Sequence, residues 1–397
     1  MVVDVFEVLL ARNAWEKRKL GELAKVRTGR AFKSSSFSPN GKYYVVTNKD
    51  IGGPQISTHM DGDRIDITNP VDIAKYSLSG RNLLVTMDGV NIGKTAMYSN
   101  EDAVLAQRVG RLTSSSLDFV HQITSQKNFL TRMNELSVGN AIKHISLKQI
   151  SDYAVNVPQQ TSERQLIGQT LSLLDNLIAA TQRRIDALEQ AKKALLQRLF
   201  DQSWRFKGYS DPWEKRKWSQ LVGISKNMVD PTTGKYDSLI HIGPGNIRSN
   251  SRELVDLKTV KDENLISGKF HFDKGDIIYG KINPQLAKYT IAPAEGLSSA
   301  DTYVLKPKSG IERLFLYYTL GTNRFFKYTV SVSQRTGMPK INRDELNAYS
   351  LIIAPSLFEQ KRIGLFLRKT DDLIAATQSR LSSLELLKKS LLQDLFI

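Results

Sequence analysis

A short loop in the first quarter of the chain has residue types that bind phosphate. Gly89-Val90-Asn91-Ile92-Gly93-Lys94-Thr95 places two glycines before a lysine and a threonine, as in the P-loop of nucleotide-binding proteins. Three residues separate the glycines, where that motif needs four. The residues that follow also favour a strand over a helix. We therefore expect a simple turn, or a loop whose lysine contacts a DNA phosphate, and no nucleotide site.

Motifs of the common enzyme classes are absent from the sequence. There is no cysteine, and the five histidines lack the spacing of metal ligands. No GxGxxG motif opens a helix, and GxSxG is missing. Asn283-Pro284-Gln285 only approaches the Asn-Pro-Pro-aromatic motif of DNA amino-methyltransferases, and the Pro-Asp dipeptide that starts a common nuclease motif does not occur. We expect no catalytic residue and no metal site.

The charge balance indicates a polyanionic partner. Lys and Arg number 56 against 40 Asp and Glu, which gives a net charge of +16. Such a surplus lies on the surface and attracts polyanions, of which nucleic acid is the commonest. An anionic membrane surface and plain solubility are the alternatives. No stretch of about 18 apolar residues is present and the start does not read as a secretory signal, so we expect a cytoplasmic protein.

Basic residues gather in loops rich in Gly, Ser and Asn, where they can contact DNA. Arg and Lys suit guanine, Asn and Gln suit adenine, and all four can contact phosphate. Any one of these residues could equally be a solvated surface charge, so the prediction depends on the cluster. The predicted DNA-binding residues are Arg27, Arg30, Lys33, Lys42, Lys94, Arg108, Lys143, His144, Lys226, Lys281, Lys288, Arg335, Lys340, Asn342 and Arg343, with Lys49 and Lys148 as further candidates.

The chain is an internal repeat. Trp15–Lys19 recurs as Trp213–Lys217, and Leu177–Gln182 recurs as Leu373–Gln378. The two identities have nearly one offset, about half the length of the chain. The residues between these markers are hard to align with one another. Fixed ends with divergent middles indicate that the ends do a shared job and that the middles do two different ones.

Each repeat closes on a predicted long helix. Ser162 with Gln165, and Ser356 with Glu359, have the spacing of a capping box. Apolar residues then recur at alternating spacings of four and three, the seam of a coiled coil. The seam positions are Ile167, Leu171, Leu174, Ile178, Thr181, Ile185, Leu188, Lys192, Leu195 and Leu199, then Ile363, Leu367, Thr370, Ile374, Thr377, Leu381, Leu384, Lys388, Leu391 and Leu395.

These two stripes predict that the helices pack on one another as an antiparallel coiled coil. The alternative is that each helix folds back on its own domain. Lys192 and Lys388 occupy equivalent seam positions. Polar seam residues can fix the register or orientation of a coiled coil. The alternative is that the two lysines only extend to solvent at the helix ends.

The divergent middles are predicted to be α+β domains. Lys42–Thr47, Arg81–Thr86 and Asp276–Tyr279 are expected strands, and Asp118–Ser137 and Glu312–Thr322 are expected helices. The whole is thus an α+β pseudo-twofold repeat with two long helices. Its predicted segments are a first domain at 1–157, a central helical region with a linker at 158–212, a second domain at 213–354 and a distal helix at 355–397.

Short segments at the domain ends and in the loops of the first domain belong to a known pattern: Trp15–Leu23, Asp88–Lys94, Gln107–Val109, Lys143–Ser146, Val157-Pro158, Ile352–Pro355 and Glu359–Ile363. Together with the repeat, they resemble the specificity subunits of type I restriction–modification systems. The resemblance covers nearly the whole chain as two variable target-recognition domains alternating with two similar helical regions. The second domain departs from the first, because its Lys281-Ile282-Asn283-Pro284 loop lacks the Gly-Lys pair and no Gln-Arg replaces Gln107-Arg108.

The resemblance implies a non-catalytic subunit that reads DNA. Each target-recognition domain of such a subunit reads half of a bipartite site in double-stranded DNA, and the helices set the spacer. Two methyltransferase subunits bind, one per repeat, and methylate adenine; restriction subunits then join. The resemblance implies no cofactor in this chain, with S-adenosylmethionine, ATP and Mg on the partner subunits. The predicted docking residues are Gln182, Arg183, Arg184, Gln378, Ser379 and Arg380.

Three other functions are alternatives to this one. A fused methyltransferase or nuclease would need a cofactor pocket, which the sequence does not show. A coiled-coil adaptor that binds no DNA would leave the positive charge and the paired divergent domains unexplained. A stand-alone DNA-binding regulator would bind its target tightly without any methyltransferase partner.

Overall fold

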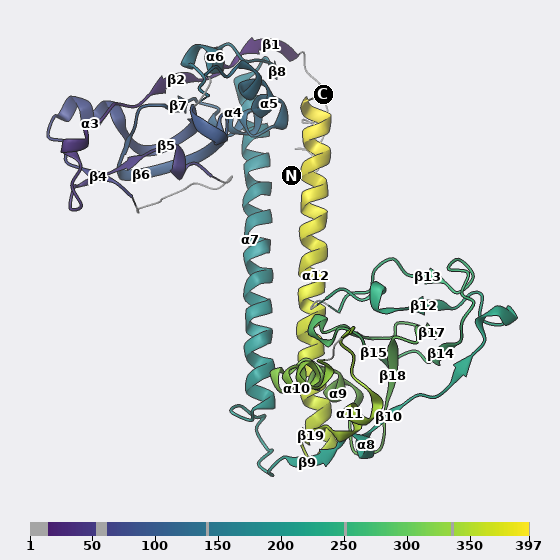
Figure 1. Ribbon diagram of the computed structural model, residues 1–397. Coiled ribbons are helices and arrows are strands. Elements are labelled where there is room, and N and C mark those ends of the chain that lie inside the picture. Colours follow the sequence, from purple (N-terminus) through teal and green to yellow (C-terminus); the bar gives the residue numbers. More distant parts are fainter. Residues whose placement is uncertain (1–14, 53–61, 140–142, 250–251, 335–336, 397) are drawn as a thin grey trace. The chain divides into compact units, whose positions relative to one another are not determined.

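The computed structural model describes residues 15–52, 62–139, 143–249, 252–334 and 337–396 (Figure 1). It divides into two compact units. The first holds the chain up to Arg183 together with its end from Gln378, and the second holds Arg184–Thr377. The division crosses both long helices, so each unit combines one α+β domain with a segment of each helix. The four predicted segments are consecutive stretches of the chain. The two units are defined by packing instead, so their boundaries differ from the predicted ones.

The first domain is built on one six-stranded sheet, in the order β2-β7-β5-β6-β3-β4. All neighbouring strands are antiparallel except β3 and β6, which are parallel. The second half of central β5 is buried on both faces: Leu83 and Val85 contact the core under the helices, and Leu84 belongs to a second core on the other face. The strands are β2 (Lys25–Thr28), β3 (Tyr43–Val46), β4 (Arg64–Ile65), β5 (Ser77–Thr86), β6 (Thr95–Leu105) and β7 (Val109–Thr113).

Short helices cover the first domain, and the predicted strands at 42–47 and 81–86 are confirmed as β3 and the end of β5. The helix expected at 118–137 is two helices, α4 and α5, which are interrupted at Ser125 and Gln126. The helices are α2 (Leu20–Leu23), α3 (Pro70–Tyr76), α4 (Leu117–Thr124), α5 (Lys127–Leu136) and α6 (Leu147–Ser151), with 3-10 turns η1 (Ser34–Ser36), η2 (Asn48–Asp50) and η3 (Gly89–Asn91).

The second domain has two sheets, in the orders β10-β18-β15-β16 and β11-β14-β17-β12-β13. The strand expected at 276–279 is confirmed as β15. The strands are β10 (Val222–Ile224), β11 (Met228–Val229), β12 (Ile240–Ile242), β13 (Lys258–Thr259), β14 (Lys269–Phe272), β15 (Ile277–Gly280), β16 (Tyr289–Ile291), β17 (Gly296–Ser298) and β18 (Thr302–Pro307). The helices are α8 (Trp218–Leu221), α9 (Arg313–Thr319), α10 (Asn323–Ser333) and α11 (Arg343–Ala348), with η4 (Pro231–Thr233), η5 (Pro244–Asn246) and η6 (Pro284–Leu286).

The repeated Trp-Glu-Lys-Arg-Lys motif forms the same small ladder in both units. β1 (Trp15–Lys19) pairs antiparallel with β8 (Ala154–Pro158), and β9 (Glu214–Lys217) pairs antiparallel with β19 (Ser350–Ile353). Each ladder joins the start of a domain to the strand that leads into its long helix. The motif therefore closes each domain at the base of its helix, and its lysines and arginines remain largely exposed.

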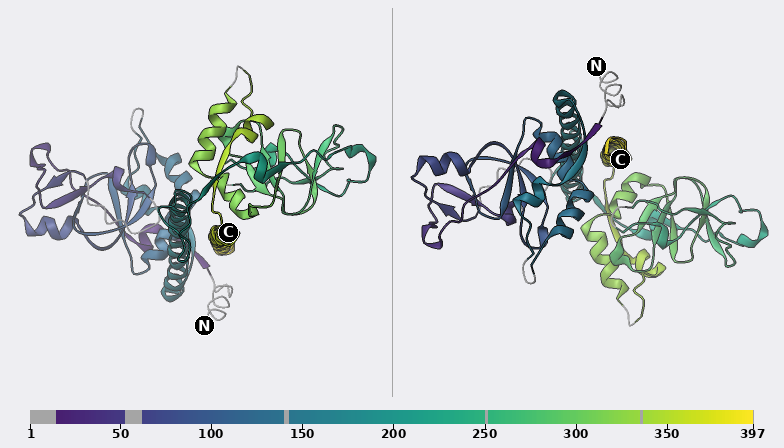
Figure 2. Two further views of the ribbon diagram at one scale, coloured as in Figure 1. Left: turned by 90° about the horizontal axis from the view of Figure 1, so that it is seen from below. Right: turned by 90° about the horizontal axis from the view of Figure 1, so that it is seen from above.

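Two 40-residue helices, α7 (Thr161–Phe200) and α12 (Leu357–Phe396), follow the two domains. Each is ~60 Å long at 1.5 Å per residue, and Figure 2 shows α12 (yellow) end-on. None of the predicted seam side chains is exposed. In the first unit Ile167 and Leu171 of α7 share a core with Leu391 of α12. In the second, Leu199 of α7 shares one with Ile363. The antiparallel coiled coil is thus confirmed.

The predicted capping boxes form only in part. In α12, the Glu359 amide donates to Ser356 Oγ at 3.4 Å, but the Glu359 carboxylate forms a bidentate pair with Arg205 at 2.8 and 2.9 Å. In α7 the helix starts at Thr161, and the side-chain amide of Gln165 donates to the backbone carbonyl of Ser115. The prediction was wrong on these side chains because tertiary partners compete with the local cap.

Buried His121 should make the first unit sensitive to acid. Its side chain is 4% exposed on α4, and Nε2 has no hydrogen-bond partner among the described residues. Burial lowers the pKa of His121 below its ordinary value of 6.5, although nearby Asp175 opposes that shift. The unfolded chain therefore takes up a proton that the folded unit resists, so stability falls as the pH drops below about 6.5.

We expect His121→Phe to reduce that loss, because the equivalent residue of the second unit, Tyr317, is also a buried aromatic. The measurement is the urea midpoint at pH 7.5 and pH 5.5 for both proteins. His241, whose pKa burial also lowers, is unchanged in the comparison. An equal loss in both proteins would contradict the role of His121.

Candidate DNA interface

Three loops of the first domain meet at the end of β5. The Met87 amide donates to the Arg108 carbonyl at 3.2 Å, and the Gly89 amide donates to the Lys143 carbonyl at 3.1 Å. Arg108 has a left-handed backbone, with φ of 69°, in the turn between β6 and β7. Its side chain is 62% exposed and pairs with Asp88 at 3.0 Å. An exposed guanidinium is thereby held at the mouth of the loops.

The structure brings five of the predicted first-domain residues to this loop cluster. Besides Lys94, Arg108, Lys143 and His144, it includes Arg30, whose carbonyl accepts from the amide of Gln107 at 2.8 Å. The Arg30 guanidinium is paired with Asp72. The five side chains are exposed, so the cluster presents a basic surface that suits phosphate and base edges.

The other three first-domain predictions lie elsewhere on the sheet. Arg27 is on β2, opposite Arg111 of β7. Lys33 precedes η1, and Lys42 precedes β3, where its ammonium lies 5.2 Å from the centre of the Tyr43 ring. All three side chains are exposed. Their contact with DNA stays a prediction.

The second domain builds the same loop framework from different residues. The amide of Lys281 donates to Asp301 at 3.0 Å, as Met87 does to Arg108. Three further amide-to-carbonyl bonds of the second domain have counterparts in the first. The bond from Gly280 to Lys288 matches that from Thr86 to Lys94, and the bond from Asn283 to Pro339 matches that from Gly89 to Lys143. The bond from Ile341 to Lys281 matches that from Ile145 to Met87. The bridge between Ile282 and Lys340 likewise matches that between Asp88 and His144.

This match shows which side chains the two domains place at one position. Arg108 corresponds to Asp301, so the charge is reversed there, while Lys94 corresponds to Lys288. The sequence could not reveal the correspondence, because the loops have no common motif and only hydrogen bonds align them. Sequence reasoning also passed over Val90, which is 99% exposed at the tip of η3 and could contact a thymine methyl group.

Several predicted second-domain residues also support the fold. Lys288 Nζ donates to the Pro244 carbonyl at 2.6 Å. The Arg343 guanidinium donates to the backbone carbonyl of Ile224, at the end of β10, at 3.3 Å and to that of Ser225 at 2.9 Å. Asn342 is the N-cap of α11 and forms a capping box with Glu345. Lys288 and Arg343 thus use their donors within the domain itself, and the share of all three side chains in DNA contact stays a prediction.

The remaining second-domain candidates are Lys226, Lys281, Lys340 and Arg335. Lys226 and Lys340 are exposed, and half-buried Lys281 lies over the Tyr303 ring at 5.8 Å. Arg335 lies outside the described residues.

The predicted docking residues lie near the middle of each long helix. Gln182, Arg183 and Arg184 of α7 are exposed, and so are Gln378, Ser379 and Arg380 of α12. Ala180 and Ala376, one residue before the buried seam threonines, are exposed as well. Seam packing explains why Thr181 and Thr377 are retained, but it does not explain identical residues on the outer faces.

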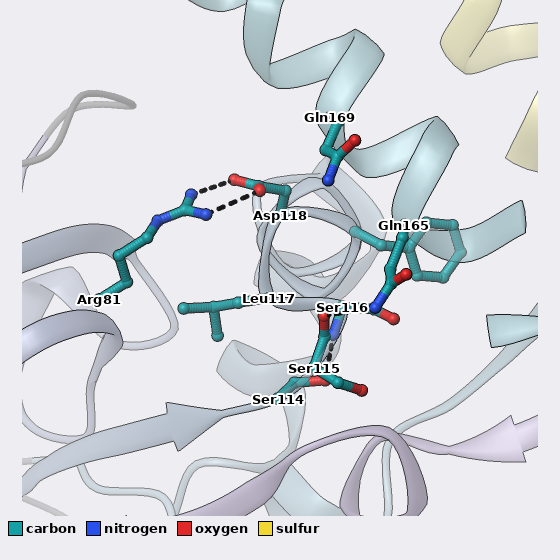
Figure 3. A pocket seen from close by; sticks show the side chains of 9 residues that line it. Arg81, Ser114, Ser115, Ser116, Leu117, Asp118, Gln165 and Gln169 are labelled. Atoms are coloured by element: carbon teal, nitrogen blue, oxygen red, sulfur yellow. Dashed lines mark hydrogen bonds and ion pairs between the residues drawn. The ribbon is translucent and has the colours of Figure 1, made fainter. Parts of the chain in front are cut away.

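A small pocket lies in the first unit where α4 meets α7 (Figure 3). Its volume is about 160 Å³, and its wall includes Ser115, Gln165 and Gln169. Arg81 and Asp118 form a bidentate pair at its edge. Gln165 Nε2 donates to the Ser115 carbonyl across the wall at 3.0 Å, so the pocket is part of the contact between domain and helix.

The described residues show neither a metal-ion cluster nor a membrane-spanning helix. No group of three or more His, Asp or Glu side chains is placed to hold a metal ion there. Within the same ranges, no helix combines the length and the apolar character that a bilayer crossing requires.

Comparisons with known proteins agree with the repeat. Residues 13–190 and 210–386 each match the model of the type I restriction modification DNA specificity domain. The EcoDI type I restriction enzyme specificity subunit of Escherichia coli is 27% identical over 277 residues, which are 62% of this chain and 60% of that protein. The MjaVIII specificity subunit of Methanocaldococcus jannaschii is 23% identical over 95% of this chain and 91% of its own length.

A solved structure has the same fold. The crystal structure of the type I restriction-modification system S subunit from M. genitalium superposes with a TM-score of 0.66 at 15% identity, over 98% of this chain and 97% of that one. The two family matches span most of the chain, one for each repeat. The chain therefore belongs to the type I restriction-modification DNA specificity family, as a DNA specificity subunit.

Proposed function

We propose that the chain reads a bipartite DNA target with its two recognition domains and docks one methyltransferase subunit on each helical repeat. The observation that carries this proposal is a contrast between the repeats. One loop framework holds Arg108 in the first domain and Asp301 in the second, whereas exposed Ala180, Gln182 and Arg184 of α7 recur as exposed Ala376, Gln378 and Arg380 of α12. Different readers on equivalent docking surfaces account for both facts.

The loop residues have the chemistry for two different half-sites. Arg108 can donate two hydrogen bonds to guanine, and Lys94 and Lys143 can neutralise phosphates. At the position of Arg108 the second domain offers the Asp301 carboxylate, which can accept from the amino group of cytosine. Lys340, equivalent to His144, then supplies a cation beside it. The two domains therefore prefer different bases at corresponding places.

The catalytic work is assigned to partner subunits. In this proposal the chain has no catalytic activity, and the methyltransferase subunits bind S-adenosylmethionine and methylate adenine. Restriction subunits join the complex and bring the ATP and Mg sites. The absence of enzyme motifs from the sequence supports this division of roles.

Methylation mapping tests the proposed function. The chain is co-expressed with its cognate methyltransferase subunit in a host free of DNA methylation, and N6-methyladenine is mapped across the genome. We expect one bipartite motif with a fixed gap. A stable complex that leaves no methylation, or a continuous motif without a gap, would overturn the proposal.

Equivalent docking surfaces make the stoichiometry testable. Arg184→Glu reverses an exposed charge on α7, and Arg380→Glu makes the same change at the equivalent position of α12. We expect two methyltransferase subunits on the wild-type chain, one on each single variant and none on the double variant. Light scattering of the purified complexes gives the masses. Two subunits on the double variant would place docking elsewhere, and Lys389→Glu is the control on the same helix.

A further inference from the structure

One aspartate of the first unit links three elements. Asp175 lies on α7, and its side chain is 12% exposed. Its Oδ1 pairs with Nζ of Lys388 on α12 at 2.5 Å, and its Oδ2 accepts from Nε2 of Gln122 on α4 at 2.9 Å. One carboxylate thus holds the recognition domain and both helices at a single point.

The second unit repeats this linkage with its own residues. Asp371 of α12 is paired with Lys192 of α7, and its Oδ2 accepts from the Tyr318 hydroxyl of α9 at 2.6 Å. Asp371 and Tyr318 lie 196 positions after their counterparts Asp175 and Gln122. Lys192 lies 196 positions before its counterpart Lys388, because the two helices exchange roles between the units. The seam lysines therefore do not extend to solvent; each binds the aspartate of the opposite helix.

Each domain also meets the helices through two equivalent apolar contacts and through a glutamine: Gln165 Nε2 donates to the Ser115 carbonyl at 3.0 Å in the first unit, and Gln360 Nε2 donates to the Gly310 carbonyl at 3.1 Å in the second. Gly168 and Gly364 let the long helix approach the start of α4 or α9, since a Cβ there would lie 2.3 Å from the Phe119 nitrogen or 2.6 Å from Leu314 Cβ. Phe119 then contacts Phe396, as Phe315 contacts Phe200. Close packing permits small rotations, whereas a hydrogen bond to a charged group is directional.

We propose that Asp175 and Asp371 are positioning residues that fix how each recognition domain is turned on the helix pair, and so fix the gap between the two half-sites. This inference rests on the proposed bipartite target. Without the aspartate bond, a domain keeps its glutamine, glycine and aromatic contacts near the helix ends but gains freedom about them. Its loops then reach phosphates one base pair to either side. Base preference is unaffected, because the loops are unchanged.

The sharpest test removes one hydroxyl from the second unit. Tyr318→Phe deletes the bond to Asp371 and leaves the ion pair with Lys192 in place. Tyr328→Phe is the matched control, since its hydroxyl donates to the Glu345 carbonyl at 2.5 Å, away from the aspartate. The complexes with the methyltransferase subunit are compared by methylation mapping. For Tyr318→Phe we expect the same half-site bases, with methylation at gaps one base pair longer or shorter raised on the order of tenfold, the factor that one hydrogen bond to a charged group implies.

Each result has one meaning. A wild-type map without a gapped motif would defeat the proposed function itself. A gapped wild-type motif with an unchanged gap spectrum in Tyr318→Phe would overturn the positioning role alone. Uniformly weaker methylation at the wild-type gap would also overturn it, because that is the result of a merely structural bond. Gln122→Leu, the corresponding change in the first unit, is expected to relax the gap in the same way.

Discussion

Gly168→Ala is expected to destabilise the first unit by about 3 kcal/mol, the upper part of the range for overpacked cores. In most helices the same change stabilises by roughly 0.5–1 kcal/mol. Here the sign reverses, because the new Cβ would lie 2.3 Å from the backbone nitrogen of Phe119 and 2.8 Å from its Cα. Backbone cannot swing aside as a side chain can, so α4 and α7 must separate.

The free energy of unfolding in urea measures this effect, with two controls. Gly52→Ala adds a methyl group that meets no described atom within 4 Å. Gly364→Ala tests the equivalent contact of the second unit, where the first atom met is Leu314 Cβ at 2.6 Å, and we expect a smaller loss. A more stable Gly168→Ala protein would show that the close approach of α4 and α7 is not required.

The two long helices and the internal repeat could be predicted because their signals can be read directly along the sequence. The seam is a period of 3.5 residues, and the internal repeat is an identity at one offset, so neither needs knowledge of distant contacts. Even there the partners of polar seam residues stayed open. Lys192 had two interpretations, and only the fold placed Asp371 beside it.

The domains could be predicted only as a class. Single strands such as β3 and β15 have strong local patterns, but their order in a sheet depends on pairings between distant residues. The parallel pairing of β3 with β6 and the two separate sheets of the second domain have no local signal. The same is true of the match between Arg108 and Asp301, which depends on backbone hydrogen bonds.

The sequence alone also does not distinguish a basic side chain that stabilises the fold from one that is exposed to a partner. Arg343, at the start of α11, and Lys340, in the segment before it, are three residues apart. The first donates to backbone carbonyls and is partly buried, while the second is exposed. Choosing basic residues in loops therefore found the first-domain cluster, but in the second domain it also selected residues that hold the loops in shape.

Changing Lys94 and Arg108 together to alanine is expected to abolish methylation of the target. The pair supplies one candidate base contact and one candidate phosphate contact. Loss of a bidentate guanine contact alone costs about 1–3 kcal/mol, and each lost phosphate contact reduces the salt dependence of binding by about 0.9 in the log–log slope. Both half-sites must be read, so the second domain cannot compensate.

Binding of the assembled complex to a duplex that carries the mapped motif gives the affinity and its salt slope. Arg18→Ala is the matched control, because Arg18 is also an exposed arginine paired with a carboxylate, Glu16, but lies on β1. The control should keep both affinity and methylation. If the double variant kept the wild-type motif and salt slope, the first-domain cluster would not be the DNA-reading surface, whereas loss of methylation with unchanged binding would move its role to a step after recognition.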